Sequence, residues 1–344
     1  MKNTRVLITA HGGPEVLKVV EEGLPEPGPT EVRLKLLVTG VAFADVLMRY
    51  GMYPNMPPLP FSPGYDVVGI VDKLGREASN VAIGDTVAAL TMFGGYSQYL
   101  CVPAAELTRV PEGLDPAEAV SLVLNYGTAQ QLIHRIAELQ PGQSVLIHGA
   151  AGGVGTALLE LGQLAGLKMF GTASRGKHDL VTALGGIPID YNSDDFVTRV
   201  LQMTNGAGVD TVFDPVGGSN WWRSYKTLRP GGKTAGGKLI GYGMSSVIDK
   251  GRPSKLRGAA SFALLGLLRI LPDGKTARRY SITTEKKHHP DWFRNDLTRL
   301  LELLRDKKIR PIISERLPLR EASRAHDLIE HARVTGKIVL LCQE

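Results

Sequence analysis

The segment 144–165, which reads SVLIHGAAGGVGTALLELGQLA, constrains the fold of this chain more than any other part of the sequence. An apolar strand pattern runs into a glycine-rich turn, and the turn opens directly into a helix pattern. Glycines at such a turn permit a tight bend, a close approach of the backbone to a pyrophosphate, and close packing of the helix on the strand. The helix start also offers unpaired N–H groups and a partial positive charge to phosphates.

Gly152 and Gly155 fit the second and third glycine positions of this dinucleotide-binding pattern, and Ala150 occupies the first. A glycine pattern alone is a weak signal, and the alternative is a tight turn with a purely structural role. The strand before the turn and the helix after it favour a dinucleotide site.

The two parts of the chain differ in their predicted secondary structure. The first 120 or so residues are strand-rich and broken by Pro and Gly turns, which predicts a compact β domain. From residue 144 onward short apolar strands alternate with helix patterns, which is typical of a doubly wound parallel sheet. At about 150 residues per domain, 344 residues suit two domains. The predicted strands of the second part are 144–148, 168–172, 187–190, 209–213 and 238–242.

The end of the second of these strands distinguishes between the two nicotinamide dinucleotides. An NAD site usually presents an acidic side chain to the ribose hydroxyls about 20 residues after the glycines. Here Ser174, Arg175 and Lys177 follow the strand, and no acid appears before Asp179. These groups suit a 2′-phosphate, which a carboxylate would repel. We therefore expect NADP(H) rather than NAD(H), the alternative being a solvated basic turn.

The strand 209–213 ends at Asp214 and is broken by Pro215, Gly217 and Gly218. The carboxyl end of a buried parallel strand lies beside the ligand crevice of such a sheet. Asp214 could therefore face a ligand or cap the following helix, and the sequence leaves both interpretations open.

Cysteine content and hydropathy bear on the compartment. Two cysteines, Cys101 and Cys342, cannot form a disulfide framework or a four-thiolate zinc site, and they suit a reducing compartment. The beginning of the chain lacks the pattern of a secretory signal. The most apolar stretch, 259–271, contains Arg269 and is too short for a membrane span, which needs about 20 residues. We therefore expect a cytoplasmic protein.

The net charge of +6 arises largely from Lys and Arg gathered between residues 226 and 287. Such a charge could serve a nucleic acid, an acidic membrane surface or an anionic cofactor. No zinc-finger spacing and no interleaved aromatic–basic strand motif accompanies it. We therefore expect a solvated basic face and no nucleic-acid partner.

Further motifs are spread along the whole chain. They are GVAFADVLMRYGMYP (40–54), SPGYDVVGIV (62–71), LNYGTA (124–129), LQPGQSVLIHGAAGGVG (139–155) and TGKIVLL (335–341). Together they resemble the medium-chain dehydrogenase/reductase superfamily, and most closely its zinc-free quinone oxidoreductase branch, with zeta-crystallin and the vesicle amine transport protein homologues. The resemblance implies a homodimer in which each chain has two domains and a cleft between them. A GroES-like β catalytic domain would span 1–122 and 280–344, and a Rossmann NADPH-binding domain would span 123–279.

The alcohol dehydrogenases of this superfamily bind a catalytic zinc ion through an early Cys, a His and a later Cys or equivalent. Ala42 stands in the first of these places and Tyr65 in the second, and no cysteine lies near 124–126. Because alanine offers no ligand atom, the resemblance implies no metal site here. A zinc alcohol dehydrogenase is the less favoured alternative.

The resemblance also implies which side chains form the site. Tyr53 would face the substrate as the hydrogen-bond or proton donor, and Phe43, Tyr65 and Asn125 would line the substrate cleft. For any one of these positions, core or loop packing is the alternative. The residues expected to contact NADPH are Ala150, Gly152, Gly153, Val154, Ser174, Arg175, Lys177, Tyr191, Gly241, Tyr242 and Lys337.

The implied reaction is zinc-independent transfer of hydride from NADPH to a quinone or an α,β-unsaturated carbonyl compound. The alternative is an NADPH-binding, weakly active homologue that acts at a membrane or lipid surface. The apolar segment 259–271 with its flanking cations could be an interfacial helix, or it could be a lid or a dimer-contact helix. Two departures from the family pattern stand out: Ala42 replaces an Asn that is common in the branch, and 233–237 is inserted after LRPGG.

Overall fold

The structure is a computed structural model that describes residues 2–231, 235–249 and 251–343. The chain divides into two compact units, Met1–Gly127 with Phe293–Glu344, and Thr128–Trp292. Both boundaries fall inside helical segments, whereas the family resemblance implied boundaries after residues 122 and 279. Part of the insertion expected at 233–237 lies outside the described residues.

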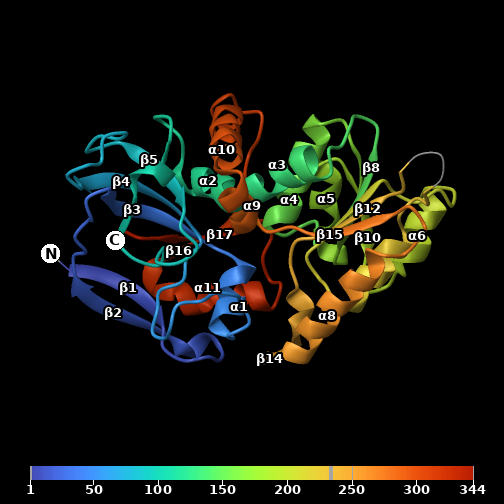
Figure 1. Cartoon of the computed structure of the whole chain (residues 1–344), viewed down its shortest axis with the longest axis horizontal. Coiled ribbons are helices and arrows are strands. Elements are labelled where there is room, and N and C mark those ends of the chain that lie inside the picture. The colour runs from blue at the N-terminus through green and yellow to red at the C-terminus, as the bar shows by residue number, and fades with distance from the viewer. Residues whose placement is uncertain (1, 232–234, 250, 344) are drawn as a thin grey trace. The chain divides into compact units, whose positions relative to one another are not determined.

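The first unit is built on a mainly antiparallel sheet completed by two strands from the end of the chain, which pair with each other in parallel (Figure 1). The strand order is β16-β17-β3-β4-β5-β7, with β6 also paired to β3, and β1 and β2 form a separate pair. The strands are β1 (Lys2–Ile8), β2 (Leu17–Gly23), β3 (Glu31–Val41), β4 (Asp66–Leu74), β5 (Thr86–Leu90), β6 (Tyr99–Pro103), β7 (Thr108–Arg109), β16 (Ile313–Pro318) and β17 (Lys337–Leu341).

Strand β3 shows why this sequence folds as a half-buried strand. Val32, Leu34 and Leu36 alternate with partly exposed residues and are each 0% exposed. Successive side chains of a strand point to opposite faces, so this alternation buries one face in the core. The helices of the unit are α1 (Phe43–Arg49), α2 (Pro116–Ser121) and α11 (Ala322–Glu330), and α10 (Pro290–Arg305) crosses the boundary between the units.

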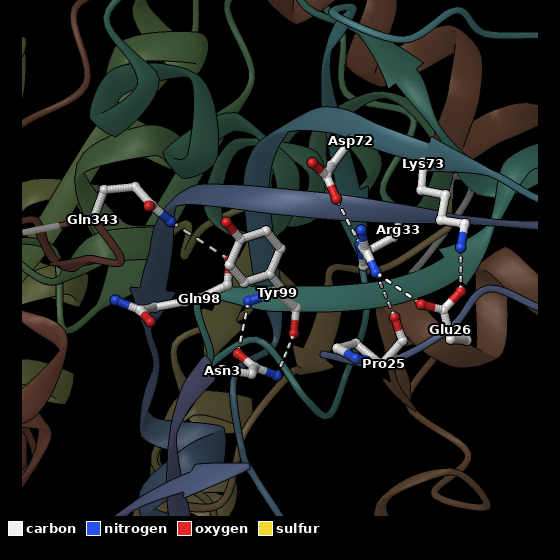
Figure 2. A network of polar contacts seen from close by, with 9 residues as sticks. All are labelled: Asn3, Pro25, Glu26, Arg33, Asp72, Lys73, Gln98, Tyr99 and Gln343. Carbon is white, nitrogen blue, oxygen red and sulfur yellow. Dashed lines mark hydrogen bonds and ion pairs between the residues drawn. The ribbon is translucent and has the colours of Figure 1, made fainter. Parts of the chain in front are cut away.

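A polar network on the first unit joins segments that are distant in sequence (Figure 2). The Arg33 Nε atom donates to Asp72 Oδ2 at 2.6 Å, and its Nη1 atom donates to Glu26 at 3.2 Å. Asn3 exchanges two hydrogen bonds with the Tyr99 backbone, at 2.9 and 3.0 Å. These contacts attach the first strand and the segment before β3 to the main sheet.

The second unit has a six-stranded sheet in which every pair is parallel. The order β10-β9-β8-β11-β12-β15 is that of a doubly wound sheet, and the predicted α/β fold class is confirmed. Helices α4 and α5 contact β8, β9 and β10, while α7 and α8 contact β11, β12 and β15. The strands are β8 (Ser144–His148), β9 (Lys168–Ala173), β10 (Gly186–Asp190), β11 (Thr211–Asp214), β12 (Lys238–Gly241) and β15 (Thr276–Arg279), and the short β13 (Ile248–Asp249) and β14 (Arg252–Pro253) pair apart from them.

The strand β15, which no apolar pattern in the sequence predicted, is short and charged, as edge strands often are. Within the described ranges, no helix has the length and apolar character needed to cross a bilayer. The helices are α3 (Gly127–Gln131), α4 (Gly153–Leu164), α5 (His178–Ala183), α6 (Phe196–Met203), α7 (Ser219–Lys226), α8 (Lys255–Leu268) and α9 (Ile282–His288).

A buried ion pair spans three adjacent strands of the first unit. The Lys337 Nζ atom of β17 donates to Asp66 Oδ2 of β4 at 2.8 Å, and both side chains are almost fully buried. Gly40 of β3 lies between them in the sheet, opposite Val339. A Cβ atom at Gly40 would collide with both charged side chains, so the missing side chain makes room for the pair.

We predict that Lys337→Met lowers the free energy of unfolding by about 3–5 kcal/mol, because it leaves the Asp66 carboxylate buried without a counter-charge. Adding Asp66→Asn should restore much of the loss. Urea unfolding measures both effects. The control Lys73→Met breaks an exposed pair with Glu26 and should cost no more than about 1 kcal/mol. Equal losses in Lys337→Met and Lys73→Met would contradict the prediction.

Candidate functional site

The predicted cofactor residues of the second unit gather at the carboxyl edge of its sheet. They follow four strand ends, β8, β9, β10 and β12, and these strands share one parallel sheet. Parallel strands end at the same edge, which is where ligands bind in open α/β sheets. The residues placed there are Ala150, Gly152, Gly153, Val154, Ser174, Arg175, Lys177, Tyr191, Gly241 and Tyr242.

The glycine turn after β8 is a close-packed cradle. Gly149 has φ +64°, a conformation that favours glycine. A Cβ atom at Gly155 would lie 2.7 Å from Ala150 backbone atoms and would collide with the Gly149 carbonyl oxygen. The helix α4 can therefore approach the end of β8 only because residue 155 has no side chain.

The start of α4 is suited to an anion. Gly152 is its N-cap in an extended conformation, and among the described residues no side chain caps the helix and no acid stands in its first turn. The first N–H groups and the positive end of the helix dipole are thus not compensated by a side-chain cap or a first-turn acid. This is the arrangement that binds a pyrophosphate.

The loop after β9 is cationic. Ser174 precedes a short 3₁₀ turn, Arg175–Lys177, in which Arg175 is exposed and Lys177 is half-buried. Burial lowers the pKa of Lys177 from its ordinary value. Tyr191, which follows β10, is 53% exposed. A hydroxyl and two cations at one turn suit a phosphate monoester.

Asp214, at the end of β11, is 0% exposed and holds its own loop. Its Oδ1 atom accepts from the N–H groups of Val216 and Gly217, at 2.7 and 3.1 Å. Its Oδ2 atom accepts from Asn220 Nδ2 at 2.8 Å and from Ser224 Oγ at 2.7 Å. The structure thus supports the capping interpretation: the carboxylate ties the turn after β11 to the beginning of α7.

Two tyrosines of the first unit form a hydrogen-bonded pair. The Tyr53 and Tyr65 hydroxyl oxygens are 2.6 Å apart, and the rings meet edge to face with centroids 6.1 Å apart. Tyr65 is 3% exposed, whereas Tyr53 is only half-buried. One ring is therefore held in the core and the other lies closer to solvent.

The structure places the other predicted substrate residues on two helical elements of the same unit. Phe43 is the first residue of α1 and is half-buried, with Ala42 as the N-cap. Asn125 is 6% exposed and lies in a π-helical segment, Leu122–Tyr126. That these side chains contact a substrate stays a prediction.

Sequence reasoning missed Asp45, which organises this part of the unit. Its carboxylate accepts from Ala42 N at 2.8 Å and from Gly64 N at 3.1 Å, so it joins the start of α1 to the residue before Tyr65. Burial raises the pKa of Asp45 to about 7. An acid three residues after a helix N-cap is a capping signal that the motif 40–54 already contained.

Lys337 lies in the first unit, where its ammonium group is buried and paired with Asp66. Its charge is thus already balanced by a carboxylate. Its contact with a cofactor remains a prediction.

The residues at the expected zinc positions do not fit that metal. Ala42 has no ligand atom, and the Tyr65 hydroxyl is hydrogen-bonded to Tyr53. Across residues 2–231, 235–249 and 251–343, no three His, Cys, Asp or Glu side chains are grouped so that they could hold a metal ion.

We predict that Gly155→Ala lowers the free energy of unfolding by about 1–3 kcal/mol, because the new methyl group must displace the backbone of the glycine turn. Thermal or urea unfolding measures this loss. Gly176→Ala is the matched control, since a Cβ atom there meets no atom within 4 Å. A Gly155→Ala protein as stable as the control would refute the close packing described here.

The chain matches two known protein families. Residues 28–112 match the alcohol dehydrogenase GroES-like domain, and residues 184–340 match the zinc-binding dehydrogenase family. A quinone oxidoreductase of Pseudomonas aeruginosa is 32% identical over 344 residues, covering 98% of this chain and 99% of that protein.

Two further proteins are similar. The human synaptic vesicle membrane protein VAT-1 homolog is 36% identical over 247 residues, which are 71% of this chain and 61% of that longer protein. The Escherichia coli quinone oxidoreductase solved in complex with NADPH superposes with a TM-score of 0.87 at 27% identity, covering 98% of this chain and 99% of that one.

Proposed function

Because this chain belongs to the medium-chain dehydrogenase/reductase superfamily, in its quinone oxidoreductase branch, we propose that it is an NADPH-dependent oxidoreductase whose acceptor is a quinone or an α,β-unsaturated carbonyl compound. The observation that carries the proposal is the glycine cradle at Gly149–Gly155, which opens into an uncapped helix start beside a cationic turn. When bound there, NADPH supplies a hydride. The protein binds and orients the cofactor and excludes water.

The choice of NADP(H) agrees with the E. coli relative, which was solved with NADPH. In this chain the pyrophosphate would lie at the start of α4, and the 2′-phosphate would lie at Ser174, Arg175 and Lys177. Tyr191, which is exposed after β10, is our candidate to cover the adenosine side. Gly241 and Tyr242 would lie along the rest of the cofactor.

In our proposal the acceptor gains a proton as well as a hydride, and the Tyr53 hydroxyl donates that proton or a hydrogen bond to the acceptor oxygen. Charge develops on this oxygen during the transfer, so a positioned donor stabilises it. Tyr65 would orient Tyr53 through the hydrogen bond of 2.6 Å between the two hydroxyl groups. Phe43 and Asn125 would line the acceptor site.

We further propose that the reaction is zinc-independent. The zinc-binding dehydrogenase family is named after the metal, but Ala42 and Tyr65 stand where ligands would be needed, and neither suits zinc. Tyr53 then takes the part that a metal ion would have in stabilising the acceptor oxygen. A homodimer is also part of the proposal, by resemblance to the branch.

A second candidate function rests on α8. Large apolar side chains are exposed on and just after this helix: Leu256 (84%), Phe262 (44%), Leu267 (52%) and Ile270 (76%). Exposed cations accompany them at Lys255, Arg257 and Arg269. An apolar face flanked by cations suits an anionic membrane surface, so a cofactor-binding protein with weak turnover at such a surface is the alternative.

We predict that the purified protein oxidises NADPH in preference to NADH when a para-quinone or a short aliphatic enone is present, and that a metal chelator leaves the rate unchanged. Absorbance of the reduced cofactor measures the rate, and the better acceptor identifies the substrate class. Tight NADPH binding without consumption would favour the second candidate. Loss of activity with the chelator would overturn zinc independence.

We predict that Tyr53→Phe lowers kcat by about 10²-fold, because it removes the proposed donor to the acceptor oxygen. Steady-state kinetics with the better acceptor measures this. Tyr50→Phe is the control: its hydroxyl donates to Glu330 at 2.6 Å, so it removes a hydroxyl from the same unit outside the proposed site. An unchanged kcat in Tyr53→Phe would remove the assignment.

A further inference from the structure

A buried chain of hydrogen bonds runs beneath the carboxyl edge of the parallel sheet. The Thr172 Oγ1 atom, at the end of β9, accepts from Gly149 N at 3.3 Å and lies 3.1 Å from His148 Nδ1. The other ring nitrogen, His148 Nε2, lies 3.0 Å from Ser224 Oγ, which donates to Asp214 Oδ2 at 2.7 Å. All four side chains are at most 3% exposed.

The chemistry of the four groups determines which of them donates in each hydrogen bond. The single hydroxyl proton of Ser224 goes to the Asp214 carboxylate, which only accepts. Ser224 Oγ must therefore accept from His148, so the proton of the ring is on Nε2. Nδ1 is then an acceptor and receives the hydroxyl proton of Thr172, whose oxygen in turn accepts the Gly149 N–H group.

The surroundings keep the ring neutral. Burial lowers the pKa of His148 from its ordinary value. The charged groups that act on it are Asp214, on the far side of Ser224, and Arg223, whose guanidinium is paired with Asp195 at 2.6 Å. Phe196 meets the ring edge to face with centroids 4.6 Å apart. A neutral imidazole with one donor and one acceptor is what the chain requires.

The two ends of this hydrogen-bond chain reach the two loops at the carboxyl edge of the sheet, where we propose that the cofactor binds. At one end Thr172 holds Gly149, the first residue of the glycine turn. At the other end Asp214 holds Val216 and Gly217, in the turn after β11. Strands β9, β8 and β11 are neighbours, so the chain ties three adjacent strand ends together.

We propose that His148 is a positioning residue, which holds the glycine turn and the loop after β11 together in the arrangement that receives the dinucleotide. This inference rests on the proposed NADPH binding. His148 does not touch the cofactor. It acts through Thr172 on the turn and through Ser224 and Asp214 on the loop.

The experiment is an NADPH fluorescence titration of the full chain and its variants. His148→Phe removes both ring hydrogen bonds and should weaken NADPH binding about tenfold, which corresponds to 1.4 kcal/mol. Thr172→Val removes the hydroxyl with little change of shape and should weaken binding similarly, whereas Thr172→Ser retains the hydroxyl and should restore it. Phe196→Leu is the control, because it loosens the packing around the ring and leaves the hydrogen bonds in place.

A second measurement tests the tautomer directly. In NMR spectra of protein labelled with ¹⁵N-histidine, the signal that His148→Phe removes should be that of a neutral ring protonated on Nε2 at neutral pH, because burial lowers the pKa of the ring. The tautomer tests the hydrogen bonds on which the inference depends. A proton on Nδ1 would overturn the inference.

The outcomes separate the two proposals. A wild-type protein that does not bind NADPH would refute the proposed function. Wild-type binding together with unchanged affinity in both His148→Phe and Thr172→Val would refute the positioning role alone. If His148→Phe fails to fold, the comparison of Thr172→Val with Thr172→Ser still decides.

Discussion

The ion pair between Lys337 and Asp66 is the constraint on which the first unit depends. It joins a strand near the end of the chain to one near the beginning, across a middle strand that has glycine at the crossing. Two buried charges are stable only when both are present, so β17 must be in place before the sheet is electrostatically complete. The second unit, 128–292, is therefore inserted into the sequence of the first unit, whose sheet is built from the segments before and after it.

The ion pair between Lys337 and Asp66 also helps to position Tyr65, which is hydrogen-bonded to Tyr53. Tyr65 lies between two anchored neighbours: the Gly64 N–H group donates to Asp45, and the Asp66 carboxylate accepts from Lys337. The backbone on both sides of Tyr65 is thus held by buried polar groups. A ring so placed can fix the hydroxyl of the more exposed Tyr53 through one short hydrogen bond. Preorganisation of this kind is what a donor to a developing oxyanion needs.

Local patterns in the sequence predicted most strands of the second unit and its glycine turn. The features that they did not predict depend on contacts between residues far apart in the sequence. Strand β8 and the turn that follows were predictable because apolar residues, glycines and a helix pattern follow one another within about 20 residues. The same logic led to the prediction that Ser174, Arg175 and Lys177, after β9, contact the cofactor. Lys337 and Asp66 are 271 positions apart, so no local pattern could pair them. The short, charged strand β15 gave no apolar signal, and its place in the sheet comes from pairing with β12.

The two units use different buried polar groups to hold the loops at their strand ends. Each must hold loops at strand ends in a fixed conformation, and each does so with polar groups buried beneath those loops. The first unit uses charges, Lys337 with Asp66, which tolerate the loss of neither partner. The second uses neutral hydrogen bonds around His148 and places its one charge, Asp214, where four donors surround it. Neutral groups suit the place beneath a turn that we propose receives a phosphate, because a buried net charge close to the turn would alter its affinity for an anion. The helix start and the cationic turn after β9 can then determine the electrostatics of the cofactor edge.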